Sequence, residues 1–226
     1  MPGPAPTIVI AIDGPSGSGK STVARGVAAA LGLRYLDTGA MYRATTWLAL
    51  QQGIALDDAD ALAGMATRAR LELTTDAAPV RVRVDGVDVT EAIRGADVTA
   101  AVSAVSAVPG VRAAMVRRQR EVIGAGGIVV EGRDIGTAVA PTAELKVFLT
   151  ADEDVRAQRR ALEVADGVET TREALARRDR LDSSRTASPL TQPADAVVID
   201  SSALSADAVI AAIVDRATAT ATRGPA

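Results

Sequence analysis

The chain has 226 residues, long enough for one complete α/β core or for one core with an inserted subdomain. It contains no cysteine and no histidine, which excludes disulfides, thiolate metal sites and the commonest general base. The net charge of -3 argues against a broad nucleic-acid-binding surface, and no apolar run approaches the ~18 residues of a membrane helix. We expect a cytoplasmic protein without a secretory signal or membrane contact, whose two termini are frayed.

The first predicted elements are a strand, a glycine-rich loop and a helix. The run TIVIAI at 7–12 is typical of a buried strand in a parallel sheet, and STVARGVAAALG at 21–32 has the apolar spacing of a helix. Between them, GPSGSGKST matches the pattern G-x-x-x-x-G-K-[ST], in which backbone N–H groups and a helix N-terminus face a phosphate. We therefore predict that a nucleoside triphosphate is bound by Gly14, Pro15, Ser16, Gly17, Ser18, Gly19, Lys20, Ser21 and Thr22.

Lys20 is one of only two lysines in the chain, against 23 arginines. A compact ammonium can reach between the β- and γ-phosphates from inside the loop, whereas a planar guanidinium is too bulky. Ser21 would place its hydroxyl on Mg²⁺. Asp13, at the end of the first strand, has two open interpretations: contact with a Mg²⁺-bound water, or stabilisation of the turn of the loop.

Strands and helices then alternate, which predicts a parallel sheet with helices on both faces and a ligand site at the carboxyl ends of its strands. These elements are a strand in RYLD at 34–37, a helix at 40–53 that Gly53 closes, strands at 128–131, 145–150 and 196–200, and a last helix from about Ser205.

One region departs from this alternation. VRVRVDGVDV at 80–89 alternates strictly around Asp85-Gly86, which predicts a two-residue β-hairpin turn of type I′. LELTT at 71–75 is a candidate third strand. An antiparallel unit of this kind cannot belong to a parallel βαβ sheet, so we interpret it as an inserted subdomain.

Arginines and aspartates gather after the strands and in one late segment. They lie in DTGAMYR at 37–43, EGRDIG at 131–136, RAQRR at 156–160 and RRDRLDSSR at 177–185. Several arginines around one anionic site suit phosphoryl transfer, in which positioning and electrostatics provide most of the catalysis, and a segment that closes over the site excludes water. Solvated helix faces and helix caps remain the alternative, and we favour a solvated face for RRQR at 117–120.

These motifs together resemble those of bacterial cytidylate kinases, in the nucleoside monophosphate kinase group. The resemblance covers nearly the whole chain, from IAIDGPSGSGKST and LDTGAMYR through VVEGRDIGT to RRDRLDSSRTASPL. It implies an α/β P-loop kinase fold with a five-stranded parallel sheet flanked by helices. It also implies one domain, with a core at 7–63, 96–150 and 190–220, a small antiparallel β insertion for the acceptor nucleotide at about 64–95, and an arginine-rich helical lid at about 152–189.

The implied reaction is direct in-line transfer of the γ-phosphoryl group of ATP, with Mg²⁺, to CMP or dCMP. The catalytic residues that the resemblance implies are Lys20, Arg133, Arg156, Arg160 and Arg178, with Arg159 as a further lid arginine. The residues that it places on the acceptor are Thr38, Arg43 and Arg133 at the phosphate, Ser103, Arg112, Asp134 and Arg185 at cytosine, and Arg178 and Asp182 at the sugar.

Asp134 is the candidate for discrimination between cytosine and uracil. A carboxylate accepts from the N4 amino group of cytosine but meets a carbonyl lone pair in uracil, a difference of about 1–3 kcal/mol. Each assignment has a structural alternative: an ion pair with a lid arginine for Asp134, packing for Ser103, a surface position for Arg112, and a salt bridge within the lid for Asp182 and Arg185.

Two other functions remain open at this point. One is a P-loop kinase for another small acceptor, such as UMP, AMP or an alcohol. The other is a non-enzymatic switch that binds ATP without turnover. No general base is evident, and an anionic phosphate acceptor needs none. We expect a monomer that binds small molecules and no nucleic acid, and the choice between CMP and dCMP stays open.

Overall fold

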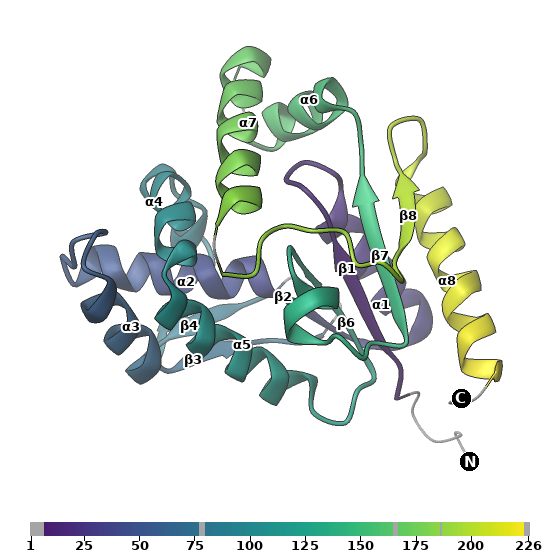
Figure 1. The fold of residues 1–226 in the computed structure, drawn as a ribbon, viewed down its shortest axis with the longest axis horizontal. Coiled ribbons are helices and arrows are strands. Elements are labelled where there is room, and N and C mark those ends of the chain that lie inside the picture. Colours follow the sequence, from purple (N-terminus) through teal and green to yellow (C-terminus); the bar gives the residue numbers. More distant parts are fainter. Residues whose placement is uncertain (1–6, 77–79, 165–166, 186, 224–226) are drawn as a thin grey trace.

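The computed structural model describes residues 7–76, 80–164, 167–185 and 187–223. At its centre is a five-stranded parallel sheet in the order β2-β6-β1-β7-β8 (Figure 1), which confirms the predicted fold class. Its strands are β1 (Val9–Asp13), β2 (Arg34–Asp37), β6 (Ile128–Gly132), β7 (Leu145–Thr150) and β8 (Val197–Asp200). The helices are α1 (Lys20–Leu31), α2 (Thr38–Gln51), α3 (Ala59–Arg68), α4 (Ala96–Ala107), α5 (Pro109–Ile123), α6 (Glu153–Val164), α7 (Val168–Ser184) and α8 (Ala206–Arg223).

β1 is the middle strand, and the direction of the chain changes beside it. The chain passes from β1 to the edge strand β2, returns to β6, and then crosses β1 to form β7 and β8. Ile10 and Ile12 of β1 are fully buried, as expected for an apolar strand covered on both faces. Because all five strands are parallel, their carboxyl ends share one edge, and the glycine-rich loop follows β1 at the topological switch point of that edge.

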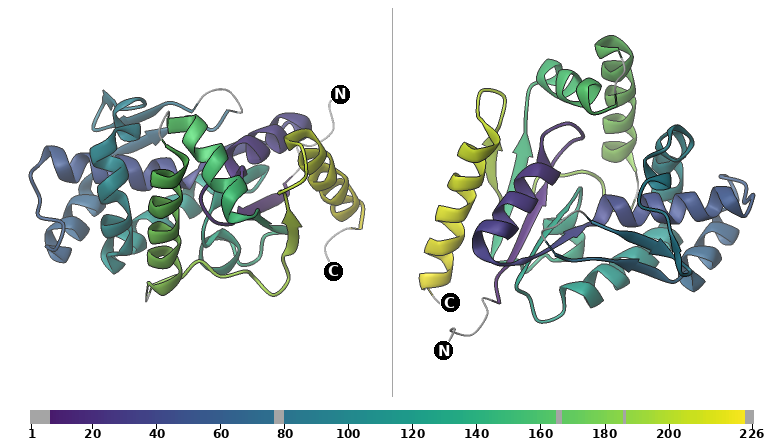
Figure 2. Two further views of the ribbon diagram at one scale, coloured as in Figure 1. Left: turned by 90° about the horizontal axis from the view of Figure 1, so that it is seen from above. Right: turned by 180° about the vertical axis from the view of Figure 1, so that it is seen from behind.

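Helices α1 and α8 pack side by side behind the sheet (Figure 2, right). A Cβ atom at Gly26 of α1 would lie 2.2 Å from Cδ1 of Ile210, so the glycine permits this close approach. Gly32, with φ 63°, ends α1 as predicted. The expected fraying of 218–223 is wrong because α8 continues to Arg223, and the segments 1–6 and 224–226 lie outside the described residues.

The antiparallel hairpin is confirmed. Strands β3 (Leu71–Leu73), β4 (Val82–Val84) and β5 (Val87–Asp88) form a separate three-stranded sheet, in which β3 and β5 pair antiparallel with β4. Both turn residues have positive φ, 49° at Asp85 and 85° at Gly86, as a type I′ turn requires. Val82 and Val84 are buried and face the same core as α2, which attaches this small sheet to the rest of the molecule.

Helices α6 and α7 pack against each other above the carboxyl edge of the large sheet (Figure 1). No single helix in the described part of the chain is long and apolar enough to cross a membrane. The pair α4 and α5 passes that test only as two helices bent by 94°.

The RRQR segment at 117–120 lies in α5, and the favoured interpretation as a solvated face fits the exposed Arg117 and Arg120 but is wrong for the buried Gln119. Arg118 donates to main-chain carbonyls at the C-terminal end of α3, and Arg120 donates to those of a π turn at Ile135–Val139. Gln119 is buried. Arg117, whose side chain is 58% exposed, and Arg120 are the exposed residues of the segment.

Arg34 supports the connection that follows α5. Its guanidinium donates to the carbonyls of Val122, Ile123 and Gly126 at 2.8, 2.9 and 2.8 Å. We expect Arg34→Ala to lower the free energy of unfolding by about 1–3 kcal/mol, because three carbonyls lose a charged donor. Urea unfolding measures this. Arg216→Ala, which removes an exposed arginine with one bond to Ala212, should change stability by about 0.5 kcal/mol or less. Equal effects of the two variants would contradict this role for Arg34.

Candidate functional site

The glycine-rich loop at 14–22 has a backbone that only glycine can adopt at two of its positions. A Cβ atom at Gly14, where φ is 149°, would lie 2.0 Å from the Leu149 carbonyl oxygen. At Gly17, where φ is 77°, it would lie 2.8 Å from the carbonyl oxygen of Arg156. The loop is therefore closely packed against β7 and α6, and α1 begins within its last residues, at Lys20.

Lys20 is buried at the start of α1, with 7% of its surface exposed. Its Nζ donates to the Pro15 carbonyl at 2.6 Å, so the side chain folds back over the loop. Burial lowers the pKa of Lys20 to about 7, and the nearby Arg133 guanidinium lowers it further. A bound anion would reverse this shift, because it favours the charged ammonium.

Four arginines join Lys20 to form the cation cluster, which consists of Lys20, Arg43, Arg133, Arg160 and Arg178. Burial lowers the pKa of Arg178 to about 9, and Arg133, Arg43 and Arg160 add repulsion. Burial likewise lowers the pKa of Arg43 to about 10, with Arg160 as its strongest cationic neighbour. Cations that repel one another in a partly desolvated site are stabilised by a polyanion. The fold thus brings together predicted site residues from the helices α1, α2, α6 and α7 and from the turn after β6.

Asp182 of α7 links this cluster to a second one. Its carboxylate lies 3.1 Å from Nε of Arg133, 3.9 Å from Nε of Arg178 and 3.8 Å from Nη1 of Arg185. Burial on its own would raise the pKa of Asp182, but the three guanidinium groups hold it below its usual value. The ion pair that we expected between Asp182 and Arg185 is present, and the Asp182 carboxylate also pairs with Arg133, which follows β6.

Arg156 attaches α6 to both the glycine-rich loop and α7. Its Nη1 donates to the Ser16 carbonyl at 3.2 Å and pairs with Asp179 at 2.5 Å. Arg159 instead donates to the hydroxyl of Ser201 at 2.9 Å and to its carbonyl at 2.8 Å. Arg156 therefore connects α6 to the loop directly, and Arg159 connects it through Ser201, whose hydroxyl donates to the Ser18 carbonyl.

The second cluster, which we call the base triad, consists of Arg112, Asp134 and Arg185. Nη2 of Arg112 forms a short ion pair with one oxygen of Asp134, and Nη2 of Arg185 lies 3.5 Å from the other. All three side chains are at most 6% exposed, so the surface alternative for Arg112 is wrong. They come from α5, from the turn after β6 and from the residue after α7, which makes the triad a long-range arrangement.

Ser103 is half-buried on α4, which packs against α7. Its carbonyl accepts from the Ser106 hydroxyl at 3.1 Å. Among the contacts of the described residues, none joins the Ser103 side chain to the base triad. A packing role and a role in binding both remain compatible with this position.

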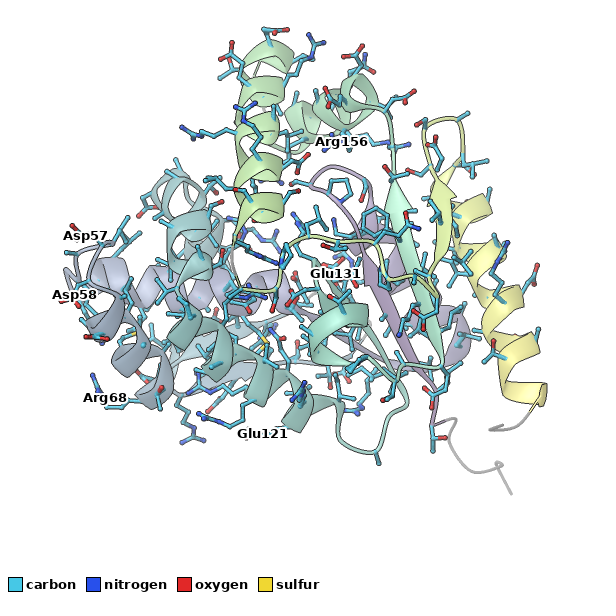
Figure 3. The ribbon with its side chains drawn as sticks, in the orientation of Figure 1. Asp57, Asp58, Arg68, Glu121, Glu131 and Arg156 are labelled. Carbon is cyan, nitrogen blue, oxygen red and sulfur yellow. The ribbon has the colours of Figure 1, made fainter. Side chains whose placement is uncertain are left out.

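Glu131 belongs to the site, although the sequence did not single it out. It lies at the end of β6, 4% exposed, where its Oε1 accepts from the Ser21 hydroxyl at 2.8 Å and from the Tyr35 hydroxyl at 2.9 Å (Figure 3). Its Oε2 is buried and has no hydrogen-bond partner within the described ranges. Burial raises the pKa of Glu131 to about 7, and Asp37 raises it further. The available signal was a single carboxylate in the otherwise apolar strand IVVEG.

Asp13 and Thr38 orient the turn after β6. Asp13 accepts from the backbone N–H groups of Ile135 and Gly136 at 2.8 and 2.7 Å, and burial raises its pKa to about 6. The Thr38 hydroxyl donates to the Glu131 carbonyl at 2.6 Å. The hydrogen bonds of the Asp13 carboxylate thus reach the turn that follows Arg133 and Asp134, and its charge also acts on Lys20 of the glycine-rich loop.

Comparison with known proteins gives one consistent family. The family model described as Cytidylate kinase matches residues 10–219. The "Cytidylate kinase" of Streptomyces coelicolor is 53% identical over 213 residues, which cover 93% of this chain and 92% of that protein. The "Bifunctional pantoate ligase/cytidylate kinase" of a Synechococcus strain is 54% identical over 205 residues, which cover 87% of this chain but only 38% of that longer protein.

A solved structure shows a similar arrangement of elements. An uncharacterized protein from Eubacterium ventriosum aligns with a TM-score of 0.54 and 12% sequence identity, covering 95% of this chain and 99% of that chain. At this identity the likeness concerns the fold alone.

Proposed function

Because the chain belongs to the cytidylate kinase family, we propose that it transfers the γ-phosphoryl group of ATP to CMP and dCMP, giving the diphosphates. The observation that carries the proposal is the juxtaposition of the half-buried cation cluster and the buried base triad. The cation cluster suits phosphates, and the base triad offers both a carboxylate and guanidinium groups to a base edge. Asp182 lies within 3.8 Å of Arg133 and of Arg185, so one nucleotide can reach both clusters.

The cation cluster supplies the electrostatic part of the reaction. Lys20 and the loop at 14–22 would hold the donor phosphates, while Thr38, Arg43 and Arg133 would hold the phosphate of the acceptor. Arg156, Arg160 and Arg178 would neutralise charge on the migrating group. The attacking atom is already an anionic phosphate oxygen, so no side chain has to remove a proton.

The base triad supplies the specificity. The Asp134 carboxylate would accept from the cytosine amino group, and Arg112 and Arg185 would donate to its ring nitrogen and carbonyl, with Ser103 beside them. Arg178 and Asp182 lie between the two clusters and are our candidates for the sugar hydroxyls. A sugar held by one Asp–Arg pair fits both CMP and dCMP.

The residues present also fit a magnesium ion. Ser21 and Glu131 present hydroxyl and carboxylate oxygens 2.8 Å apart, and the unpartnered Oε2 of Glu131 is a hard donor of the kind that Mg²⁺ prefers. Bound there with the donor phosphates, the ion would neutralise their charge. Both oxygens of Asp13 accept backbone N–H groups, so Glu131 is a better candidate than Asp13 for a metal-bound water.

The parts of the chain around the site have proposed roles as well. Helices α6 and α7, within 152–189, would act as a lid, since their arginines reach the loop at 14–22 and the cation cluster. The segment at 64–95, with its antiparallel sheet, would lie on the acceptor side. A monomeric state and a cytoplasmic location stay predictions.

The test is an initial-rate assay with ATP and Mg²⁺ that compares CMP, dCMP, UMP, AMP and an alcohol such as shikimate as acceptors. We expect CMP and dCMP to react with kcat/KM at least about 10-fold above every other acceptor, as one missing base contact already costs about this much. Faster reaction of another acceptor would favour a different small-molecule kinase. ATP binding without turnover of any acceptor would favour the non-enzymatic switch.

A further inference from the structure

Asp13, the last residue of β1, is a buried carboxylate to which the proposed mechanism gives no role. It is 1% exposed, its Oδ1 accepts from the Ile135 N–H at 2.8 Å, and its Oδ2 accepts from the Gly136 N–H at 2.7 Å. Burial raises the pKa of Asp13 to about 6, but the two N–H groups oppose that rise, so the carboxylate is mostly ionised at neutral pH. Burying a charged group costs free energy, so its presence here calls for an explanation beyond stability.

The turn after β6 is attached to Asp13 at two points. The backbone of Asp13 pairs with Gly132 at the end of β6. Its side chain then binds the N–H of Ile135, three residues further along. The two residues between these attachments are Arg133 and Asp134, which are our candidates for the acceptor phosphate and the base. Asp13 thus holds both ends of the short segment that would bind the acceptor.

The peptide group that joins Asp134 to Ile135 is held at both of its polar atoms. Its N–H donates to Asp13, and its carbonyl accepts from the N–H groups of Ala138 and Val139 at 2.8 and 3.2 Å. A peptide group is planar and its plane contains the preceding Cα atom, so these bonds fix the position of Cα in Asp134. The direction of the Asp134 side chain therefore depends on a plane that Asp13 holds.

We propose that Asp13 is a positioning residue that holds Asp134 in place for the pyrimidine base and thereby contributes to base selection. This inference rests on the proposed function. In this role Asp13 does not touch the nucleotide, because its two oxygens are already bound to the turn. A turn that is formed before CMP binds lowers the ordering cost of binding. Gly14 follows Asp13 directly, so one residue joins the loop at 14–22 to the turn that would bind the acceptor.

The central test is Asp13→Asn, which keeps the shape of the side chain. An amide can accept from only one of the two N–H groups and presents its own N–H to the other. We expect the preference for CMP over UMP, measured as the ratio of kcat/KM values, to fall about 10-fold and KM for CMP to rise about 10-fold. Both kcat and KM for ATP should stay within about 3-fold of wild type. Initial rates well below the melting temperature measure these values.

Arg34→Ala is the matched control for lost stability. Arg34 begins β2 at the amino edge of the large sheet, opposite to the site, and its guanidinium binds only main-chain carbonyls after α5. This variant should lower thermal stability and leave the ratio of CMP to UMP unchanged. A merely structural role for Asp13 predicts the same result for Asp13→Asn, that is, lower stability with wild-type base preference.

A double variant tests whether Asp13 acts through Asp134. We expect Asp13→Asn combined with Asp134→Asn to show the same ratio of CMP to UMP as Asp134→Asn alone, because Asp13 affects the base only through Asp134. Losses of preference that multiply in the double variant would contradict this route.

Hydrogen exchange in the wild-type protein tests the preformed turn without any substitution. We expect the Ile135 and Gly136 amides to exchange at least about 100-fold more slowly than in an unstructured peptide, both without and with CMP. If Asp13→Asn does not fold, this measurement decides. Rapid exchange that slows only when CMP binds would overturn the inference, since the nucleotide would then order the turn.

The outcomes separate this inference from the proposed function. Wild-type base preference and wild-type KM for CMP in Asp13→Asn would overturn the inference while CMP phosphorylation stands. A wild-type protein that does not phosphorylate CMP would overturn both.

Discussion

Lys20→Met should lower kcat for CMP phosphorylation by about 10²–10³-fold, because it removes a buried cation from the path of the migrating phosphoryl group. Lys20→Arg should rescue little of this loss, since the planar guanidinium does not fit inside the loop. Initial rates at saturating ATP and CMP measure both variants.

The chain contains a matched control for this prediction. Lys146 is the other lysine, and it is 8% exposed and paired with Asp195 at 2.7 Å. Lys146→Met should lower the free energy of unfolding but leave kcat within about 3-fold of wild type, because the pair lies outside both clusters. Equal losses of kcat in the two methionine variants would show that Lys20 acts through stability and not through the transferred group.

Asp134→Asn should lower the preference for CMP over UMP by about 10–100-fold, because the new amide can donate to the uracil carbonyl that a carboxylate repels. It should also destabilise the fold by about 3 kcal/mol, since Arg112 and Arg185 lose their buried counter-charge. Specificity constants for the two acceptors, measured well below the melting temperature, separate the two effects.

Asp179→Asn is the control for the loss of an arginine partner. Asp179 pairs with Arg156 at 2.5 Å but does not belong to the base triad. Its replacement should slow transfer without changing the ratio of CMP to UMP. A change of base preference in Asp179→Asn, or none in Asp134→Asn, would contradict the role assigned to the triad.

The sequence was most informative where the determinants are local. Short, mostly apolar runs located all five strands of the large sheet, and strict alternation around Asp85-Gly86 located the hairpin, because strand patterns and turn residues are properties of short segments. The glycine-rich loop at 14–22 was recognisable for the same reason. Gly14, Gly17 and Gly19 all have positive φ, which is a property of the loop backbone itself.

The interaction partners of charged side chains could not be predicted from local sequence patterns. Ser21 and Glu131 are 110 residues apart, and they meet only because β1 and β6 pair in the register that sets Asp13 opposite Gly132. The same register places the Asp13 carboxylate within hydrogen-bond distance of the N–H groups that follow β6. Side-chain contacts of this kind depend on the tertiary arrangement, which no local pattern specifies.

The sequence also did not show which residues of a helix face solvent. RRQR at 117–120 has the composition of a solvated surface, yet Arg118 and Arg120 bind the ends of neighbouring elements and Gln119 is buried between them. Arginine can do this because its long stem packs while its guanidinium reaches distant carbonyls. Glu131, which sequence reasoning missed, is a polar group with an unpartnered atom inside the described structure, as expected where a ligand completes the site.

We expect one nucleoside monophosphate to span the cation cluster and the base triad, which Asp182 connects. A crystal structure with CMP bound tests it most directly. We expect the phosphate of CMP to contact Arg43 and Arg133, and its amino group to donate to Asp134. A base bound away from Asp134, or a phosphate held only by the loop at 14–22, would contradict it.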